Sequence, residues 1–128
     1  MITCFTMDGV EYNVHVISLK RLFEIKESIS AKTTQSGGIY RAILGTYYNY
    51  QITVQEKDGD RESLDAFWDA ISRPDTYHEC VFPYNQSTIR QNMYVRSGNQ
   101  EIRRLSKDGT SWRDITVQFF AQEPKVKP

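Results

Sequence analysis

The sequence has few of the residues from which catalytic and metal sites are built. It contains two histidines, His15 and His78, and two cysteines, Cys4 and Cys80. These four residues form no CxxC pair and no zinc-ligand spacing. The chain also has no GxSxG, GxGxxG or P-loop pattern. We therefore expect no enzyme, no catalytic residue, no metal site and no bound cofactor.

Cysteine is too scarce to hold the fold together by itself. A disulfide between Cys4 and Cys80 requires the fold to bring them close, which the sequence alone does not show. We expect both to be reduced and to behave as buried, small hydrophobic residues.

The chain lacks an excess of charge of either sign. It has 16 Lys and Arg residues against 16 Asp and Glu residues, so its formal net charge is zero. Proteins that bind nucleic acid through its phosphates usually carry a basic excess. We therefore expect no sequence-specific nucleic-acid binding. A net charge near zero also favours self-association over repulsion between copies.

Long hydrophobic runs are absent as well. No stretch approaches the roughly 20 apolar residues of a membrane span, and the N-terminus has no basic region followed by an apolar run. We expect a soluble protein, synthesised in the cytoplasm, with no membrane partner. Hydrophobic residues make up 39% of the chain, below the usual share. This low share indicates a thin core, a large polar surface or help from partner subunits.

The strongest strand pattern in the sequence is "GTYYNYQITV", Gly45 to Val54. Apolar and polar residues alternate there with a period of two, which is typical of a half-buried strand. The alternation places Tyr48 and Tyr50 in the core and exposes Tyr47 and Asn49 on the opposite face. Gly45 interrupts the pattern and indicates a bulge or a bend.

The segments before this strand favour a long hairpin. "MDG" predicts a turn between two short strands at the start of the chain. Phe23 and Ile25 alternate with charged residues, as in a half-buried strand. "AKTTQSGG" follows, with Gly37 and Gly38 able to adopt positive φ. We interpret it as the flexible tip of a long hairpin arm.

One helix is expected, in "DGDRESLDAFWDAISRP". Its apolar residues recur at helical spacing, Asp60 is a suitable N-cap, and Pro74 ends it. We expect it to lie across a sheet. The acidic residues before it do not match a calcium loop, which needs Gly at its sixth and Glu at its twelfth position, so a turn and a helix cap explain them better.

The rest of the chain reads as strands spaced about ten residues apart, with turn residues between them. We therefore expect a mainly β fold with one α-helix: an antiparallel β-sandwich or barrel of about seven to eight strands. Residues 1–122 form a single domain, and residues 123–128, with two prolines and two lysines, form a flexible C-terminal tail.

Basic residues in the second half leave two interpretations open. They form either a strip across neighbouring strands that contacts phosphate or an acidic partner, or a solvated edge that discourages strand pairing. We favour the solvated edge. The residues are Arg90, Arg96, Arg103, Arg104 and Lys107.

The order of several segments resembles small tail proteins encoded by phages and prophages of Gram-positive bacteria. The matching pieces are "VISLKR", "RAILGTYYNYQITV", "FWDAIS" before Pro74, and "HECVFP". The most characteristic piece is "YVRSGNQEIRRLSKDGTSWRDITVQFFAQEP". The resemblance covers nearly the whole chain, from about Val16 to Pro124, and it is a resemblance of pattern rather than of one diagnostic motif.

The resemblance implies a structural protein of the virion. Tail-tube-like and distal-tail-like proteins share a β-sandwich or barrel with one flanking helix, and they assemble into rings, commonly hexameric, whose lumen can pass DNA. Hairpin arms and termini contact neighbouring subunits. The chain is short for a distal tail protein, so a tube-like, adaptor or baseplate subunit fits better.

Mapped onto this sequence, the arm spans about Ser30 to Tyr40. The expected partners are other copies of the chain and other tail proteins. The candidate oligomer-interface residues are Thr33, Thr34, Gln35, Gly37, Gly38, Tyr40, Tyr47 and Asn49. The alternative function is a monomeric β-sandwich that binds a glycan or peptide through exposed aromatic residues, namely Tyr47, Tyr84 and Tyr94.

Overall fold

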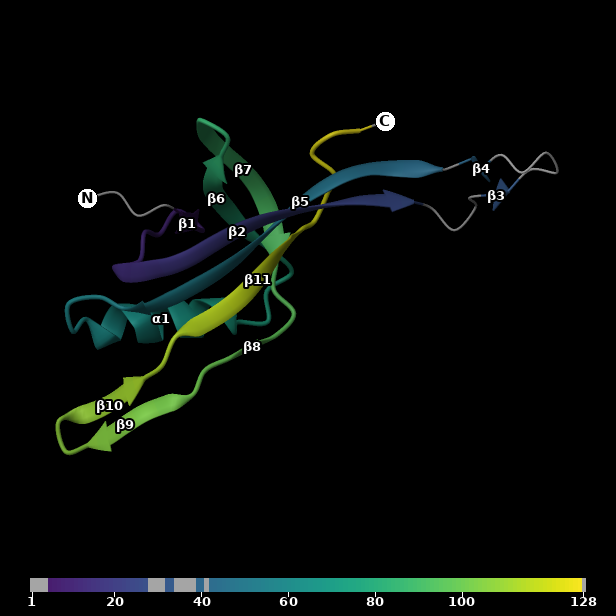
Figure 1. Ribbon diagram of the computed structural model, residues 1–128. Coiled ribbons are helices and arrows are strands. Elements are labelled where there is room, and N and C mark those ends of the chain that lie inside the picture. The colour runs from purple at the N-terminus through teal and green to yellow at the C-terminus, as the bar shows by residue number, and fades with distance from the viewer. Residues whose placement is uncertain (1–4, 28–31, 34–38, 41, 128) are drawn as a thin grey trace.

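The computed structural model describes residues 5–27, 32–33, 39–40 and 42–127. In these ranges the protein is mainly β with one helix, as the sequence predicts. The strands form one seven-stranded antiparallel sheet and two separate two-stranded sheets, and the large sheet does not close into a barrel (Figure 1). The elements are β1 (Thr6–Met7), β2 (Val14–Glu27), β3 (Lys32–Thr33), β4 (Ile39–Tyr40), β5 (Ile43–Glu56), α1 (Arg61–Ile71), β6 (His78–Tyr84), β7 (Ser87–Tyr94), β8 (Gly98–Asn99), β9 (Ile102–Ser106), β10 (Gly109–Trp112) and β11 (Ile115–Ala121).

Strand β11 joins the two halves of the large sheet. The strand order is β1-β6-β7-β11-β5-β2, with β8 also paired to β11. Residues 115–119 of β11 pair with β5, whereas Phe120 and Ala121 pair with β7. The β6–β7 hairpin therefore turns away from the direction of β2 and β5 (Figure 1). The bent sheet and α1 together enclose the core.

The predicted turn at "MDG" is confirmed, but the predicted pairing of its flanking strands is wrong. Asp8 and Gly9 both have positive φ, and the backbones of Met7 and Val10 exchange two hydrogen bonds. This is the geometry of a tight hairpin turn. Beyond the turn, however, β1 pairs with β6, and β2 pairs with β5. Strand β2 pairs with β5 rather than with β1, because the 14 residues of β5 offer many more backbone hydrogen bonds than the two residues of β1.

The bulge expected near Gly45 is confirmed. Lys26 pairs with Gly45 but Glu27 pairs with Ile43, so Leu44 is an extra residue in β5. Leu44, which the period of two places on the core side, is exposed in the structure. Gly45 has a φ of 143°, a conformation that glycine adopts without strain.

The core contains most of the residues that the alternation places there. Tyr50, Ile52 and Val54 of β5 are buried, and Tyr50 stacks on Phe82 with ring centroids 4.5 Å apart. The Tyr50 hydroxyl donates a hydrogen bond to the Pro83 carbonyl, so its polar end is satisfied as well. Tyr48 is only half-buried.

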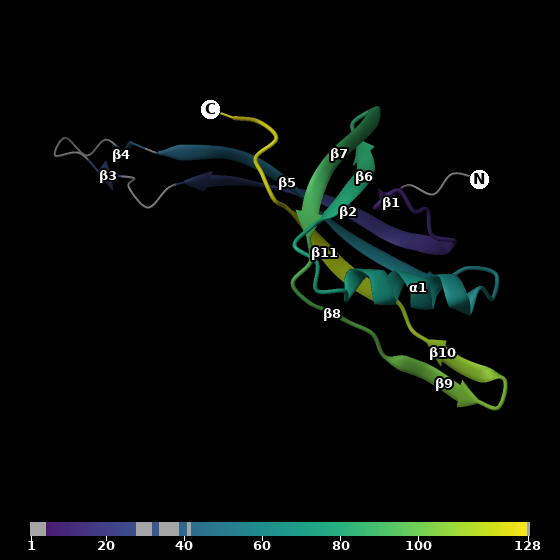
Figure 2. The same cartoon turned by 180° about the vertical axis from the view of Figure 1, so that it is seen from behind.

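Helix α1 lies across the sheet, as the sequence predicts (Figure 2). Asp60 is its N-cap and accepts a hydrogen bond from the Ser63 amide, 3.1 Å away. The buried face of the helix packs into the core. Its buried residues are Leu64, Phe67, Ala70 and Ile71.

The sequence predicts a flexible tail from residue 123. In the structure this segment turns back along β5: the Thr46 amide donates to the Val126 carbonyl, and the Lys125 amide donates to the Thr46 carbonyl. Val126 therefore forms an isolated bridge with Thr46 of β5.

Candidate functional site

The groups that resemble catalytic residues make structural contacts. His78 is buried, and its Nδ1 lies 2.7 Å from Asp8 Oδ2, which links the first turn to β6. Cys80 is fully buried, and burial raises the pKa of its thiol to about 12. A thiol with so high a pKa remains protonated and is a poor nucleophile. Within the described residues, no group of His, Cys, Asp and Glu side chains is placed to hold a metal ion.

The arm is the most prominent projection of the structure. Strands β2 and β5 pair over their whole length and extend past the rest of the sheet as a two-stranded ribbon (Figures 1 and 2). The sequence predicts the arm at about Ser30 to Tyr40, most of which lies outside the described residues, so from here on we use "arm" for the ribbon that leads to it, from Leu22 to Glu27 and from Ile43 to Asn49. Thr33 and Tyr40 lie beyond it, in the β3–β4 pair. Thr34, Gln35, Gly37 and Gly38 lie outside the described residues.

One face of the arm is apolar and exposed. Phe23 pairs with Tyr48 and Ile25 with Thr46, so Phe23 and Ile25 lie on the same face as Tyr50 and Ile52. That face is core near α1, but on the arm it emerges from the molecule. The exposed fraction of Phe23 is 68%, and Ile25 and Ile43 are exposed too. The apolar pattern of the core thus continues beyond the core.

The opposite face of the arm contains Tyr47 and Asn49, and only Tyr47 is accessible. The Lys26 amine lies 4.4 Å from the centre of the Tyr47 ring, a cation–π contact. Asn49, predicted to be exposed, has an exposed fraction of 7%. Its Oδ1 accepts a hydrogen bond from the Ala121 amide at 2.9 Å. The predicted exposure of Asn49 is therefore wrong, because the end of β11 covers its side chain.

The three tyrosines of the alternative binding site do not form a single platform. Tyr84 packs against Tyr48, with ring centroids 5.3 Å apart. Tyr94, at the other end of β7, stacks on Phe120. Tyr47 lies on the arm beside Lys26. Each ring is engaged by different neighbours on a different element.

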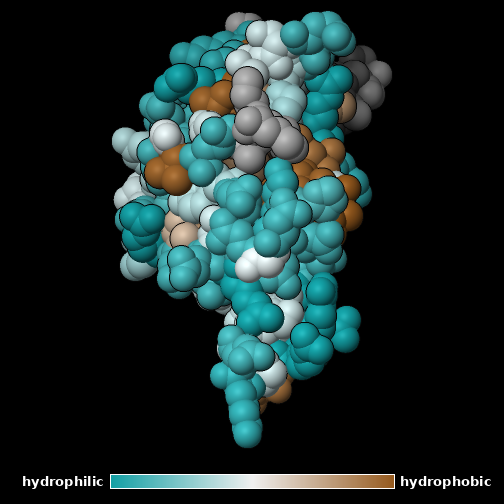
Figure 3. All heavy atoms as spheres, turned by 90° about the vertical axis from the view of Figure 1, so that its left-hand side faces the viewer, coloured by the Kyte–Doolittle hydropathy of each residue, from teal (hydrophilic) through white to brown (hydrophobic). Residues whose placement is uncertain are grey.

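The basic residues do not form one strip. Arg90 is in the β6–β7 hairpin, where it pairs with Glu79 at 2.7 Å. Arg96 lies over the Phe120 ring. Arg103, Arg104 and Lys107 belong to the separate β9–β10 hairpin, a largely hydrophilic projection in Figure 3.

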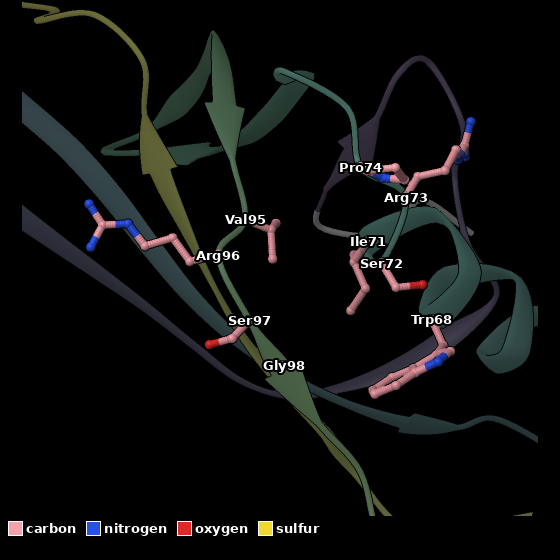
Figure 4. Close-up of a pocket in the computed structure, with 9 residues that line it drawn as sticks. All are labelled: Trp68, Ile71, Ser72, Arg73, Pro74, Val95, Arg96, Ser97 and Gly98. Atoms are coloured by element: carbon pink, nitrogen blue, oxygen red, sulfur yellow. The ribbon is translucent and has the colours of Figure 1, made fainter.

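The structure also contains a groove that the sequence did not reveal. On one side of Trp68 is a hollow of about 340 Å³, into which the Trp68 indole, Ile71 and Val95 point, whereas the guanidinium groups of Arg73 and Arg96 point away (Figure 4). A second hollow, of about 420 Å³, is also lined by Trp68, together with Asp65, Asp69, Gln100 and Trp112. We call the two hollows together the Trp68 groove.

The sequence signal for this groove is weak. Asp65, Trp68 and Asp69 have the spacing of one helix face, but Trp68 also fits the apolar stripe of the helix. Trp112 comes from β10, far along the chain. No local pattern connects residues that only the tertiary fold brings together.

No protein-family model and no curated protein matches this sequence. The part of the chain that the structure describes holds no helix with the length and apolarity needed to cross a membrane.

Proposed function

We propose that this protein is a structural subunit of a bacteriophage tail, of the tube-like, adaptor or baseplate kind, that assembles into rings through strand edges and its hairpin arm. The observation that carries the proposal is the arm, with its exposed apolar face at Phe23, Ile25 and Ile43. The resemblance of the sequence to small tail proteins supplies the biological setting.

The physical argument starts from the position of β2 in the sheet. It is a 14-residue strand at the end of the strand order, so one side of its backbone is not paired within the large sheet. Edge strands of this length are templates for pairing with another chain. Exposed apolar side chains on the same ribbon, those of Phe23, Ile25 and Ile43, favour protein–protein contact rather than solvation. Both features belong to an element that projects from the domain.

The arm is held in place by contacts with other parts of the chain. The C-terminal segment hydrogen-bonds to Thr46, and Tyr48 packs against Tyr84. The Arg21 guanidinium donates a 2.7 Å hydrogen bond to Asn85, at the tip of the β6–β7 hairpin. A braced arm loses less conformational entropy on binding than a free one, which favours association.

The first test measures assembly. Light scattering after size exclusion, over a range of protein concentrations, should detect oligomers of the wild-type protein, and electron microscopy should show rings. Assembly should also be measured after co-expression with other tail proteins. A strict monomer under all these conditions would rule the proposal out.

The second test locates the interface. Phe23→Ser with Ile25→Ser should weaken assembly and leave the melting temperature almost unchanged, because both side chains are exposed. Tyr77→Ser is the matched control, since Tyr77 is an exposed aromatic residue outside the arm. Deleting residues 33–38 should also weaken assembly. If assembly survives all the arm variants undiminished, the arm is not the interface.

The alternative, a monomeric module that binds a glycan or peptide, makes a different prediction. Glycan-array binding by a monomer, lost in Tyr47→Ala, would favour it over a tail subunit. The separation of Tyr47, Tyr84 and Tyr94 on three elements argues against a shared stacking surface.

A further inference from the structure

The Trp68 groove combines two features that suit a cationic side chain with an apolar stem. The faces of Trp68 and Trp112 are apolar, and an indole face attracts cations. Asp65 and Asp69 add two carboxylates on the same helix face. A ligand with a positively charged group beside an apolar group would contact the carboxylates and the indole faces at the same time.

The two carboxylates lack a cationic partner within the described ranges. No Lys, Arg or His in that part of the chain forms an ion pair with either, in contrast to Glu56, Glu79 and Glu101, which pair with arginines. Burial raises the pKa of Asp65, and the charges of Asp69 and Glu56 raise it further. Negative charge is thus concentrated beside the groove without compensation.

The β9–β10 hairpin has the complementary properties. All five residues of β9 are exposed, and the exposed fraction of Leu105 is 75%. Arg104 precedes Leu105 and points to the other face of β9, and Lys107 follows the end of the strand; neither forms an ion pair with the rest of the described chain. A two-stranded hairpin is marginally stable in isolation. Contact with a further surface would therefore stabilise it.

The hairpin cannot occupy the groove of its own chain. Trp112 of β10 forms a wall of that groove. The turn of the hairpin is held next to the start of α1, where Arg61 donates a hydrogen bond to the Asp108 carbonyl. If the hairpin moved into this groove, Trp112 would leave its position and the groove would lose one of its walls. The occupant must come from another chain.

We propose that the Trp68 groove of one subunit receives the β9–β10 hairpin of the next subunit, with Leu105 against the indoles, Lys107 at the carboxylates of Asp65 and Asp69, and Arg104 adding positive charge from the other face of the hairpin. The contact joins two different surfaces, so it is head-to-tail and can close into a ring. This inference rests on the proposed function in one respect, namely that the chain assembles with itself.

Charge reversal tests the contact. One variant changes the groove, Asp65→Lys with Asp69→Lys, and a second changes the hairpin, Arg104→Glu with Lys107→Glu. All four side chains belong to exposed residues, so both variants should fold, and their melting curves check this. We expect each variant alone to weaken association at least about tenfold, since like charges then meet at the contact.

Restoring complementarity is the decisive step. An equimolar mixture of the two variants should assemble again as an alternating ring with an even number of subunits. The variant with all four changes should assemble with itself. Gln86→Lys with Thr88→Lys, on the exposed β6–β7 hairpin, is the control for added charge and should assemble like wild type.

The outcomes separate this inference from the proposed function. Recovery of assembly in the mixture and in the fourfold variant supports the contact. If wild type forms rings and the reversals have no effect, or if neither combination restores assembly, a different partner fills the groove and the inference is wrong while the proposed function stands. If wild type never assembles, both are wrong.

Discussion

Gly45 and Pro124 lie so close together that no side chain fits between them. A Cβ atom on Gly45 would lie 2.5 Å from the Pro124 Cβ and 2.6 Å from the Val126 carbonyl oxygen. The bulge in β5 and the path of the C-terminal segment therefore depend on each other. Glycine at position 45 is required both by its φ and by its neighbour.

Gly45→Ala should displace the C-terminal segment from the arm. We expect a loss of about 2 kcal/mol in the free energy of unfolding, from the backbone strain and the clash together. Urea denaturation measures it. Gly59→Ala is the control, because Gly59 also has a positive φ but has open space around it. An equal loss in both variants would mean that the clash contributes nothing.

Asn49→Ala should destabilise the fold without a direct effect on assembly. The Ala121 amide would lose its acceptor in a buried place, which costs about 1–3 kcal/mol. Thr88→Ala, at an exposed position, is the control for truncation. Unfolding curves and light scattering on the same samples distinguish the two roles: weaker assembly with unchanged stability would restore Asn49 as an interface residue.

Asp8 should make stability depend on pH in the acid range. Burial works against its ionised form, but hydrogen bonds with His78 and from the Glu79 amide, with the charges of His78 and Arg73, outweigh it and lower the pKa of Asp8 below 3.8. The ionised group therefore stabilises the fold above pH 3.8, and this contribution is lost as the pH falls through the lowered pKa. Thermal unfolding at a series of pH values down to about pH 2 should show this loss, and Asp8→Asn should reduce it. The same acid dependence in Asp8→Asn would assign it to other carboxyl groups.

Cys80 should react with iodoacetamide only when the protein unfolds. The thiol is fully buried, and its pKa is raised to about 12, so both access and the thiolate form are suppressed. Mass spectrometry of the Cys4→Ser variant, with and without urea, isolates this thiol, and Cys4→Ser with Cys80→Ser gives the background. Rapid labelling under native conditions would contradict the buried position.

Features encoded over a few neighbouring residues could be predicted from the sequence. The helix follows from its apolar spacing and from Asp60, and the bulge follows from one glycine in an alternating strand. The hairpin arm follows from two alternating segments around a polar, glycine-containing loop. Each of these signals is local, so neither the pairing of distant strands nor the path of the C-terminus is needed to read it.

Features that depend on distant residues could not be predicted. Asn49 has the polarity of an exposed residue, but the backbone of β11 buries it. β1 has a turn that fits pairing with the next strand, yet its partner is β6. The Trp68 groove needs α1 and β10 in contact, and no periodicity encodes that contact. In each case the fold decides which of two locally acceptable arrangements occurs.

The central position of β11 has a consequence for how the chain acquires its structure. β11 is the last strand of the described chain, yet it lies between β7 and β5 in the strand order. During synthesis, β2 and β5 can pair early, and so can β6 and β7, because each pair is close in sequence. Until residues 115–121 leave the ribosome, the edges of β5 and β7 that pair with β11 in the folded protein remain open to solvent. A chain interrupted before that point would expose two sheet edges at once, so premature termination should produce aggregates rather than a smaller folded domain.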